Sequence, residues 1–390
     1  MPETADVVVI GLGAMGSAAL HRLALAGVRA VGIDRFHPPH DRGSSHGESR
    51  ITRLAVGEGA IYAPLVRRSH EIWRELEAQT GEQLMLTTGG LIMGVRGGSA
   101  RHHGKDDFVS RTIAVAAAHG IAHEVLDAAA IAARFPQFRL RGDEWGIFEP
   151  SAGLLFPERC IAVQLRLAKV AGAVVHLGET VRSVRDLPDG VEVVTDRRVL
   201  QAGRAVVAAG PWMAGLTGPR LASKLRVFRQ SLHWFATDAP DAYAPGRFPV
   251  FIWMHGAGDT DYMYGFPVLP GATAIKLATE HYAEAIDPDR IDPVVTAAES
   301  ADFHARHVAG RLRDVTDRPV RSAACMYTVS PDSGFIVDTL TDTSNVLVAS
   351  ACSGHGFKHS AALGELLATR ALGAATLPAA FALALYETTP

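Results

Sequence analysis

The sequence predicts an α/β protein built from two interleaved domains, one around a parallel sheet and one, of α+β type, on a mainly antiparallel sheet. An apolar strand at residues 6–10, which runs into a glycine-rich turn and a helical stretch at 17–26, is typical of the first domain. Alternating segments at 226–235 and 262–266 predict strands of the second. The 390 residues are enough for two domains and a large core.

The first turn has the pattern of a dinucleotide-binding site. It reads, in order, Gly11, Leu12, Gly13, Ala14, Met15 and Gly16. In such a pattern the first glycine allows the tight turn, the second lets the backbone approach a pyrophosphate, and the third lets the helix pack on the strand. A second strand at 30–33 ends at Asp34 and Arg35, about where an acid binds a ribose hydroxyl. We therefore expect a Rossmann-type domain with phosphates at the helix N-terminus.

Both FAD and NAD are compatible with this turn, so the choice depends on later residues. The segment 204–210 predicts a short buried strand that ends in Gly210 and is followed by Pro211 and Trp212. Many flavoproteins return to the sheet beside the nucleotide with such a segment. Residues 43–53 then offer hydroxyls, a histidine and two arginines soon after the second strand. These features favour FAD.

Composition argues against several other classes of protein. Proteins that bind a polyanion usually carry a net positive charge. The net charge here is −3, so nucleic acid is not expected as a partner. No apolar run reaches the ~18 residues of a membrane span, and the amino terminus lacks a basic-then-apolar signal; we expect no membrane partner and a cytoplasmic protein. The cysteines Cys160, Cys325 and Cys352 are odd in number and widely spaced, which argues against a disulfide framework, and no zinc spacing predicts a metal site.

Three further motifs together resemble one enzyme family. They are the run Cys325, Met326 and Tyr327, the glycine-rich segment 353–358, and the segment with Ser45, His46, Arg50 and Arg53. With the first turn, they make the chain resemble the monomeric sarcosine oxidase and N-methyltryptophan oxidase family of amine-oxidising flavoenzymes, from the first strand to about residue 387. The resemblance implies an FAD-binding domain at 1–85, 150–218 and 322–390, a substrate domain at 86–149 and 219–321, and a monomer.

The resemblance also implies that FAD is attached to the sulfur of Cys325 through its 8α carbon. On sequence alone, a cysteine on a strand of small residues is usually buried and inert. A thiolate is the required nucleophile, so His46 or Arg50 should assist, while Cys352 is expected to be a packing residue. A backbone contact to adenine is implied near Val181. The other expected FAD contacts are Gly11, Gly13, Ala14, Met15, Gly16, Asp34, Arg35, Ser45, Gly210, Trp212, Met326, Gly354, Gly356, Phe357 and Lys358.

Catalytic roles follow from the same resemblance. Arg53 and Lys358 match the pair that binds the substrate carboxylate, a charge-assisted clamp. Lys276 lies on an otherwise apolar strand, where a charge needs a partner or a function; the matching lysine of the family promotes the reaction with oxygen. Tyr264 and Tyr327 match aromatic residues of the pocket.

The chain departs from the family on the substrate side. An ungapped alignment from Lys276 puts Glu280 where sarcosine oxidases carry an active-site histidine, with His281 one residue later. A shift of one residue on a strand exchanges the side chains that face the ligand. If Glu280 faces the pocket, its charge should favour a substrate with a second cationic or hydroxyl-rich group. Ile252 falls where sarcosine oxidase has a methionine, so sarcosine itself does not follow as the substrate.

The sequence therefore predicts an FAD oxidase that converts a secondary, N-methyl amino acid to an imine and passes the electrons to oxygen. Hydrolysis of the imine would give an amine and an aldehyde, with hydrogen peroxide as coproduct. Three alternatives remain open at this point. They are an oxidase of cyclic imino acids or of sugar-amine adducts, a dehydrogenase that reduces a quinone or a carrier protein, and a flavin-binding protein without turnover.

Overall fold

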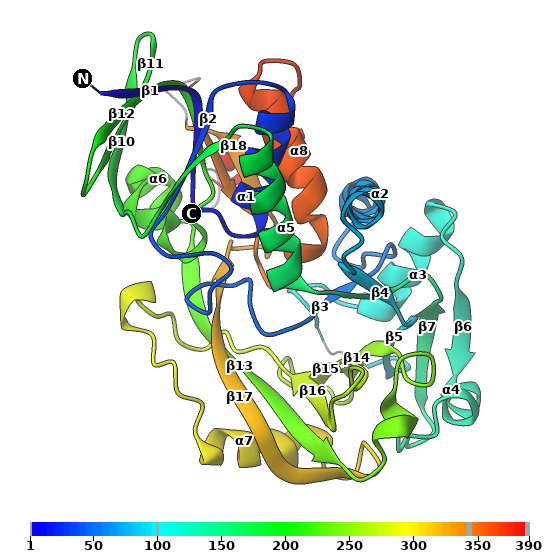
Figure 1. Ribbon diagram of the computed structural model, residues 1–390. Helices are drawn as coiled ribbons and strands as arrows, with labels where there is room; N and C mark the ends of the chain where they lie inside the picture. Colours follow the sequence, from blue (N-terminus) through cyan, green and yellow to red (C-terminus); the bar gives the residue numbers. More distant parts are fainter. Residues whose placement is uncertain (1, 99–100, 341–344, 387–390) are drawn as a thin grey trace.

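The computed structural model describes residues 2–98, 101–340 and 345–386, which form two eight-stranded sheets joined by a three-stranded one (Figure 1). The predicted α/β fold, with a parallel sheet and a mainly antiparallel sheet built from interleaved segments, is confirmed. Within these residues, no helix is both long enough and apolar enough to cross a membrane.

The first sheet carries the glycine-rich turn. Four of its strands lie in the order β9, β2, β1 and β12. The second half of β12 pairs with β19, which pairs in turn with β18, and the first half of β12 pairs with β11 of the hairpin β10–β11. The four last residues of β1 are all buried, because helices and neighbouring strands enclose both faces of a parallel sheet. The strands are β1 (Glu3–Ile10), β2 (Ala30–Asp34), β9 (Val174–Leu177), β10 (Val181–Leu187), β11 (Gly190–Thr195), β12 (Val199–Val207), β18 (Ile336–Thr339) and β19 (Val346–Ser350).

Helices from both ends of the chain pack together on this sheet. The helix α1 lies against both α5 and α8, and α2 packs on α8 (Figure 1). The predicted helix at 17–26 is confirmed; α1 begins three residues earlier than expected, directly after Gly13. The helices are α1 (Ala14–Leu25), α2 (Ala63–Thr80), α5 (Pro157–Val170), α6 (Gly218–Ala222) and α8 (Ser360–Ala371).

The second sheet runs in the order β17, β13, β16, β15, β14, β5, β7 and β6, and its only parallel pair among the described strands is β5 with β14. Long strands β13 and β17 form one side of it (Figure 1). Its strands are β5 (Gly90–Val95), β6 (Glu124–Asp127), β7 (Glu144–Glu149), β13 (Arg226–Thr237), β14 (Val250–Met254), β15 (Tyr262–Gly265), β16 (Ala274–Ala278) and β17 (Val315–Val329). Its helices are α3 (Phe108–Ala118), α4 (Ala128–Arg134) and α7 (Ala297–Phe303), which continues into a π-helix (His304–Val308).

The junction differs from the sequence expectation at one boundary. The expected return to the FAD-binding domain at residue 322 falls inside β17, which pairs with β13 as far as Val329. Cys325, Met326 and Tyr327 therefore belong to the second sheet, and the chain crosses back only after β17. A small sheet of β3 (Arg50–Thr52), β8 (Gly153–Leu155) and β4 (Met85–Thr87) lies between the two halves.

We predict that the contact between α1 and α8 tolerates no side chain at Gly364. A Cβ atom there would lie 2.2 Å from the Cβ of Ala18, so Gly364→Ala forces the helices apart. The expected loss is about 1–3 kcal/mol of the free energy of unfolding, the usual cost of overpacking a core, measured by denaturant titration. Gly215→Ala is the control, because a Cβ at Gly215 meets no atom within 4 Å. Equal stability of the two variants would contradict this account of the packing.

Candidate functional site

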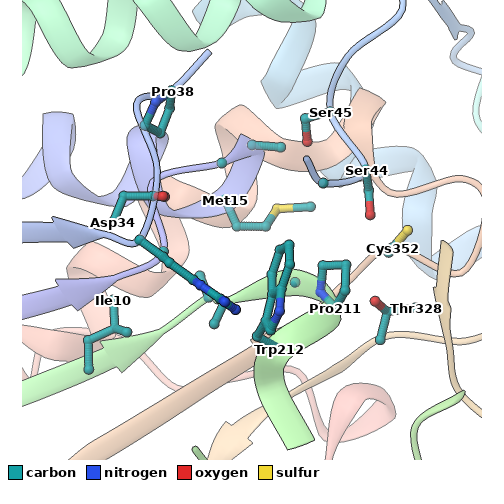
Figure 2. Close-up of a pocket in the computed structure, with 18 of the residues that line it drawn as sticks. Ile10, Met15, Asp34, Pro38, Ser44, Ser45, Pro211, Trp212, Thr328 and Cys352 are labelled. Atoms are coloured by element: carbon teal, nitrogen blue, oxygen red, sulfur yellow. The ribbon is translucent and has the colours of Figure 1, made fainter. Parts of the chain in front are cut away.

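A cleft of about 390 Å³ opens beside the glycine-rich turn (Figure 2). Its walls come from β1 and α1, from the segments after β2 and β12, and from β17 and the end of β19. In Figure 2 the side chains of Asp34, Met15, Trp212 and Cys352 surround the same space. A second, smaller cavity of about 60 Å³ adjoins it, and both are lined by Arg50, Tyr327, Gly354 and Phe357.

The turn has the geometry that a dinucleotide requires. A Cβ at Gly16 would lie 1.7 Å from the carbonyl oxygen of Gly11, so only glycine lets α1 start this close to β1. The carboxylate of Asp34 accepts hydrogen bonds from the backbone N–H groups of Leu12 and Phe36, both at 2.7 Å. Gly13 and Ala14 line the cleft, so the N-terminus of α1 faces it with its positive dipole end, and no described side chain caps this terminus. These residues fit a bound diphosphate and ribose.

An aromatic and ionic contact closes the far side of the cleft. Trp212 donates its indole N–H to Asp289 at 2.9 Å, and the guanidinium of Arg35 reaches the same oxygen at 2.5 Å. Arg35 also lies 5.7 Å from the centre of the Trp212 ring. Asp289 comes from the loop after β16, so this contact joins the substrate half to the nucleotide half. Nothing in the sequence singled out Asp289.

Most of the expected FAD contacts line this cleft. They are Gly11, Gly13, Ala14, Met15, Asp34, Arg35, Ser45, Arg50, Val181, Gly210, Trp212, Gly354, Gly356 and Phe357. Gly16, His46, Cys325 and Met326 do not line it, and Lys358 lines the smaller cavity instead.

His46 is not a cation, contrary to the role expected for it beside the cysteine. Burial, then the charge of Arg50, lowers its pKa to about 4. Arg50 donates to the carbonyl oxygens of Ser49 and Ser44, both at 2.8 Å, and is the fixed positive charge of this region.

The two cysteines near the cleft have different positions. Cys325 lies on β17 and is 1% exposed, among Leu232, Trp234 and Tyr327. Cys352, which the sequence treated as a packing residue, lines the cleft. Burial raises the pKa of the Cys325 thiol, and the charges of Arg50 and Lys276 act in the opposite direction.

The smaller cavity contains a buried carboxylate that the sequence analysis missed. Arg53 donates to both oxygens of Glu58, at 2.8 and 3.0 Å, and to the carbonyl oxygen of Ala55. Lys358 lies 3.6 Å from Glu58 and donates to the carbonyl oxygen of His355 at 2.8 Å. Burial opposes a charge on Glu58, but Arg53 and Lys358 outweigh it and hold its pKa well below the usual range. The expected carboxylate-binding pair is thus already joined to an internal carboxylate.

Glu280 also lines this cavity, and its charge is compensated. His103 bridges the two acids, with Nδ1 3.1 Å from Glu58 and Nε2 3.1 Å from Glu280. Tyr262 and Tyr282 donate hydrogen bonds to the other oxygen of Glu280, at 2.6 and 2.7 Å. Burial disfavours a charge on His103, yet the two acids raise its pKa to about 9. The expectation that Glu280 adds free negative charge for a cationic substrate group therefore loses its physical basis.

His281, the alternative to Glu280, is exposed and does not line the cavity. The chain turns out of β16 at this point, and the His281 backbone pairs with the side chain of Gln230 through two hydrogen bonds, at 2.7 and 2.8 Å. Gly354 leaves room for the bridge on the other side, because a Cβ there would lie 2.7 Å from Nε2 of His103.

The cluster of Glu58, His102 and His103 has ligand atoms close enough to hold a metal ion. Arg53 and Lys358 already place two positive charges on the same carboxylate, and His103 prefers to carry a proton. A divalent cation would have to displace that proton beside these two cations, so the chemistry of this site disfavours a metal.

Lys276 lies on β16 with its charged end buried between the sheets. Nζ donates to the carbonyl oxygens of Gly47 and Ser49, at 2.6 and 2.8 Å, and is 3.2 Å from the Ser49 hydroxyl. The rings of Phe266 and Trp234 lie 4.5 and 5.4 Å away. Burial, and then Arg50, push the pKa of Lys276 well below its ordinary value. The strand thus places a buried amine with a lowered pKa in the wall of the smaller cavity.

Two tyrosines and an aliphatic residue complete the smaller cavity. The hydroxyls of Tyr264 and Tyr327 are 3.3 Å apart, on β15 and β17, and Ile252 of β14 forms an apolar wall. The structure therefore brings Arg53, Lys358, Lys276, Tyr264, Tyr327 and Glu280 into one small space.

The residues that sequence reasoning missed here are Glu58, His102, His103 and His355. Glu58 is a single acid in an otherwise apolar and glycine-rich stretch, the same signal that drew attention to Lys276. The histidines stand in a polar loop and a glycine-rich turn, which carry no such signal.

The fold and the cleft define an enzyme that binds a dinucleotide on a Rossmann-type sheet and works on a small substrate beneath a second sheet. The family described as FAD dependent oxidoreductase (DAO) matches residues 6–370. The chain belongs to this family of FAD-dependent oxidoreductases.

Curated relatives cover nearly the whole chain. The monomeric sarcosine oxidase of Streptomyces avermitilis is 35% identical over 379 residues, 96% of each chain. The N-methyl-L-tryptophan oxidase of Salmonella newport is 32% identical over 368 residues, which covers 94% of this chain and 95% of that protein.

Solved structures share the fold at lower identity. NikD, an unusual amino acid oxidase essential for nikkomycin biosynthesis, has a TM-score of 0.82 at 24% identity and 97% coverage of both chains. The deglycating fructosamine oxidase of Aspergillus fumigatus has a TM-score of 0.75 at 15% identity, covering 98% of this chain and 89% of that one. These likenesses support the fold alone.

We predict that anions bind the smaller cavity less tightly as the pH rises. Lys358 has a pKa of about 8 and His103 of about 9; both are cations below these values and lose their charge above them. The dissociation constant of acetate for the FAD-loaded protein should rise roughly tenfold or more from pH 7 to pH 10, a change of about 1.4 kcal/mol or more. His103→Gln should weaken binding at pH 7 and leave only the lower step. Affinity that stays constant to pH 10 would contradict these charges.

Proposed function

We propose that this protein is an oxidase of a secondary, N-methyl amino acid. One observation carries the proposal: Arg53, Lys358 and Lys276 open onto a single small cavity that adjoins the nucleotide cleft. The names of the relatives, sarcosine oxidase and N-methyltryptophan oxidase, support the same type of substrate. Bound FAD would supply the chemistry of accepting two electrons from the carbon next to the amine.

The charges of the cavity suit one carboxylate. Arg50, Arg53, Lys358 and protonated His103 carry four positive charges around the cavity, and Glu58 and Glu280 carry two negative ones. A bound amino acid with its amine neutral adds one negative charge and reduces this excess of positive charge. Arg53 and Lys358 orient the carboxylate, and therefore the α-carbon, by charge-assisted hydrogen bonds. The small volume, about 60 Å³, favours a short side chain.

A screen for hydrogen peroxide under air tests this function. N-methyl, cyclic and glycated amino acids should be compared, and an N-methyl amino acid should give peroxide and aldehyde. Strong turnover of only cyclic or glycated substrates would move the assignment to those oxidases. Reduction of a dye without peroxide would make the protein a dehydrogenase. A flavin that no amine bleaches anaerobically would remove the enzymatic function altogether.

We predict that Arg53 acts on the carboxylate of the substrate. Arg53→Ala should weaken catalysis on the acid by roughly 2–5 kcal/mol, the scale of breaking a buried hydrogen-bonded charge pair, and should affect the methyl ester much less. Arg67→Ala, at an exposed arginine of α2, is the control. The measurement is kcat/KM for acid and ester. The same loss for both substrates would argue that Arg53 supports the flavin instead.

We propose that a thioether joins Cys325 to the 8α carbon of FAD. Formation of the bond removes the thiol hydrogen and one methyl hydrogen, and oxygen takes up the two electrons. Arg50 and Lys276 support the required thiolate through their charges. Acid-denatured protein should stay yellow, and Cys325→Ala should release its flavin. Cys352→Ala is the matched control, because Cys352, unlike Cys325, lines the cleft. Flavin released only by Cys352→Ala would reverse the assignment.

We predict that Lys276 serves the reaction with oxygen. The negative charge that oxygen gains on reduction favours the protonated form of the Lys276 amine, whose pKa burial has lowered, and that cation in turn stabilises the negative charge. Lys276→Met should therefore slow reoxidation of the reduced enzyme by oxygen far more than it slows anaerobic reduction by substrate. Stopped-flow absorbance separates the two half-reactions, and equal slowing of both would reassign Lys276 to substrate binding.

A further inference from the structure

His102 is a buried histidine in the wall of the smaller cavity, and the proposed reaction gives it no role. Its side chain is 3% exposed, and its Nδ1 has no hydrogen-bond partner among the described residues. A buried polar atom without a partner costs free energy, which a bound molecule recovers by supplying that partner. His102 therefore offers a hydrogen bond to a molecule that occupies the cavity.

The position of this ring is fixed by its neighbours. The ring centres of His103, Phe108 and Tyr262 lie 3.9, 4.6 and 4.9 Å from that of His102. The backbone groups of His102 and Lys105 exchange two hydrogen bonds, at 3.1 and 2.9 Å, which close the turn that carries both histidines. In this turn His103 has a φ of 48°, a left-handed conformation that is uncommon outside glycine. Such strained residues persist where the surrounding structure holds them, and they cluster at ligand sites.

The ring of His102 carries no charge. Burial, and then the charge of His103, lowers the pKa of His102 to about 3. A neutral imidazole has one donor nitrogen and one acceptor nitrogen, and the tautomer decides which of them is Nδ1. A hydroxyl group both donates and accepts, so it can pair with Nδ1 in either tautomer.

His102 lies next to the residues that we propose bind the substrate carboxylate. One of its ring nitrogens, an oxygen of Glu58 and a ring nitrogen of His103 lie within 4.8 Å of one another. Glu58 is the acid that joins Arg53 and Lys358. A second carboxylate at this place would meet the negative charge of Glu58, and a cationic group would meet the positive charges around it. A neutral polar group avoids both repulsions.

We propose that His102 recognises a hydroxyl group on the β-carbon of the substrate, so that the protein prefers a hydroxylated N-methyl amino acid to one with a plain alkyl side chain. This proposal rests on the oxidase function given above and names its substrate class. Such a hydroxyl is separated from the carboxylate by only the α- and β-carbons, which suits a cavity of about 60 Å³. A substrate without the hydroxyl leaves the buried nitrogen unpaired and is disfavoured for that reason.

Binding of carboxylates that lack an amine tests the recognition without turnover. In titrations of the FAD-loaded protein followed by flavin absorbance, β-hydroxypropanoate should bind roughly tenfold or more tightly than butanoate, in which a methyl group replaces the hydroxyl, a difference of about 1.4 kcal/mol or more. His102→Phe keeps an aromatic ring and removes both nitrogens, so it should bring the two dissociation constants within about twofold, or about 0.4 kcal/mol. His21→Phe is the matched control and should keep the preference, because His21 is also buried with an unpartnered nitrogen but lines neither cavity.

Turnover gives a second measurement on the same variants. In the unchanged protein, kcat/KM for N-methylserine should exceed that for N-methylalanine roughly tenfold or more, a difference of about 1.4 kcal/mol or more, and His102→Phe should bring the two values within about twofold, or about 0.4 kcal/mol. The unchanged protein keeps the proposal testable if His102→Phe fails to retain flavin, because both preferences are measured on it directly.

The outcomes separate this proposal from the oxidase function. Equal binding of β-hydroxypropanoate and butanoate by the unchanged protein, or a preference that survives His102→Phe, would overturn the role of His102. Tighter binding of succinate or of β-alanine than of β-hydroxypropanoate would also overturn it, because the cavity would then recognise a second charge. A protein that prefers β-hydroxypropanoate through His102 but oxidises no N-methyl amino acid would overturn the oxidase function and leave the recognition of the hydroxyl intact.

Discussion

The buried carboxylate of Glu58 is the constraint on which the site depends. Arg53 is 1% exposed and Lys358 5% exposed, and two such cations could not stay charged in this interior without an anion between them. Glu58 supplies that anion and also accepts a hydrogen bond from Nδ1 of protonated His103. Because His103 also hydrogen-bonds to Glu280, one chain of contacts links the segment after β3, the 101–107 loop and the residues just after β16. Arg53 and Lys358, which we propose bind the substrate carboxylate, are thereby held in place before any substrate arrives.

Lys276 stands apart from this group of charges. Its Nζ is held by carbonyl oxygens of the 47–49 segment rather than by a carboxylate. The proposed roles therefore fall on residues with different partners: Arg53 and Lys358, proposed to bind the substrate carboxylate, share Glu58, whereas Lys276, proposed to serve the reaction with oxygen, does not.

Sequence reasoning succeeded where the relevant contacts are local. The glycine-rich turn, Asp34 and the helix α1 follow from spacing within a few residues, and the structure has them. It failed where partners are far apart in the chain. His103 and Glu280 are separated by 177 residues, and Trp212 and Asp289 by 77, so no local pattern announces either contact. The domain boundary expected at residue 322 falls inside β17, because pairing with β13 keeps the chain in the second sheet as far as Val329.

The sequence by itself determined a Rossmann-type sheet that binds a dinucleotide, because strand periodicity and a glycine-rich turn act over short distances. The oxidase function and the basic residues of its site came from the resemblance of its motifs to a family of flavoenzymes. Only the tertiary structure decided the charge state of the site. A single acid at Glu58 and a polar turn at His103 acquire their roles through burial, which makes each unpaired charge costly and so selects partners from distant segments. The tertiary structure also decided that Glu280, and not His281, faces the cavity. Two tyrosines and the imidazole of His103 hydrogen-bond to the Glu280 carboxylate just after β16 ends.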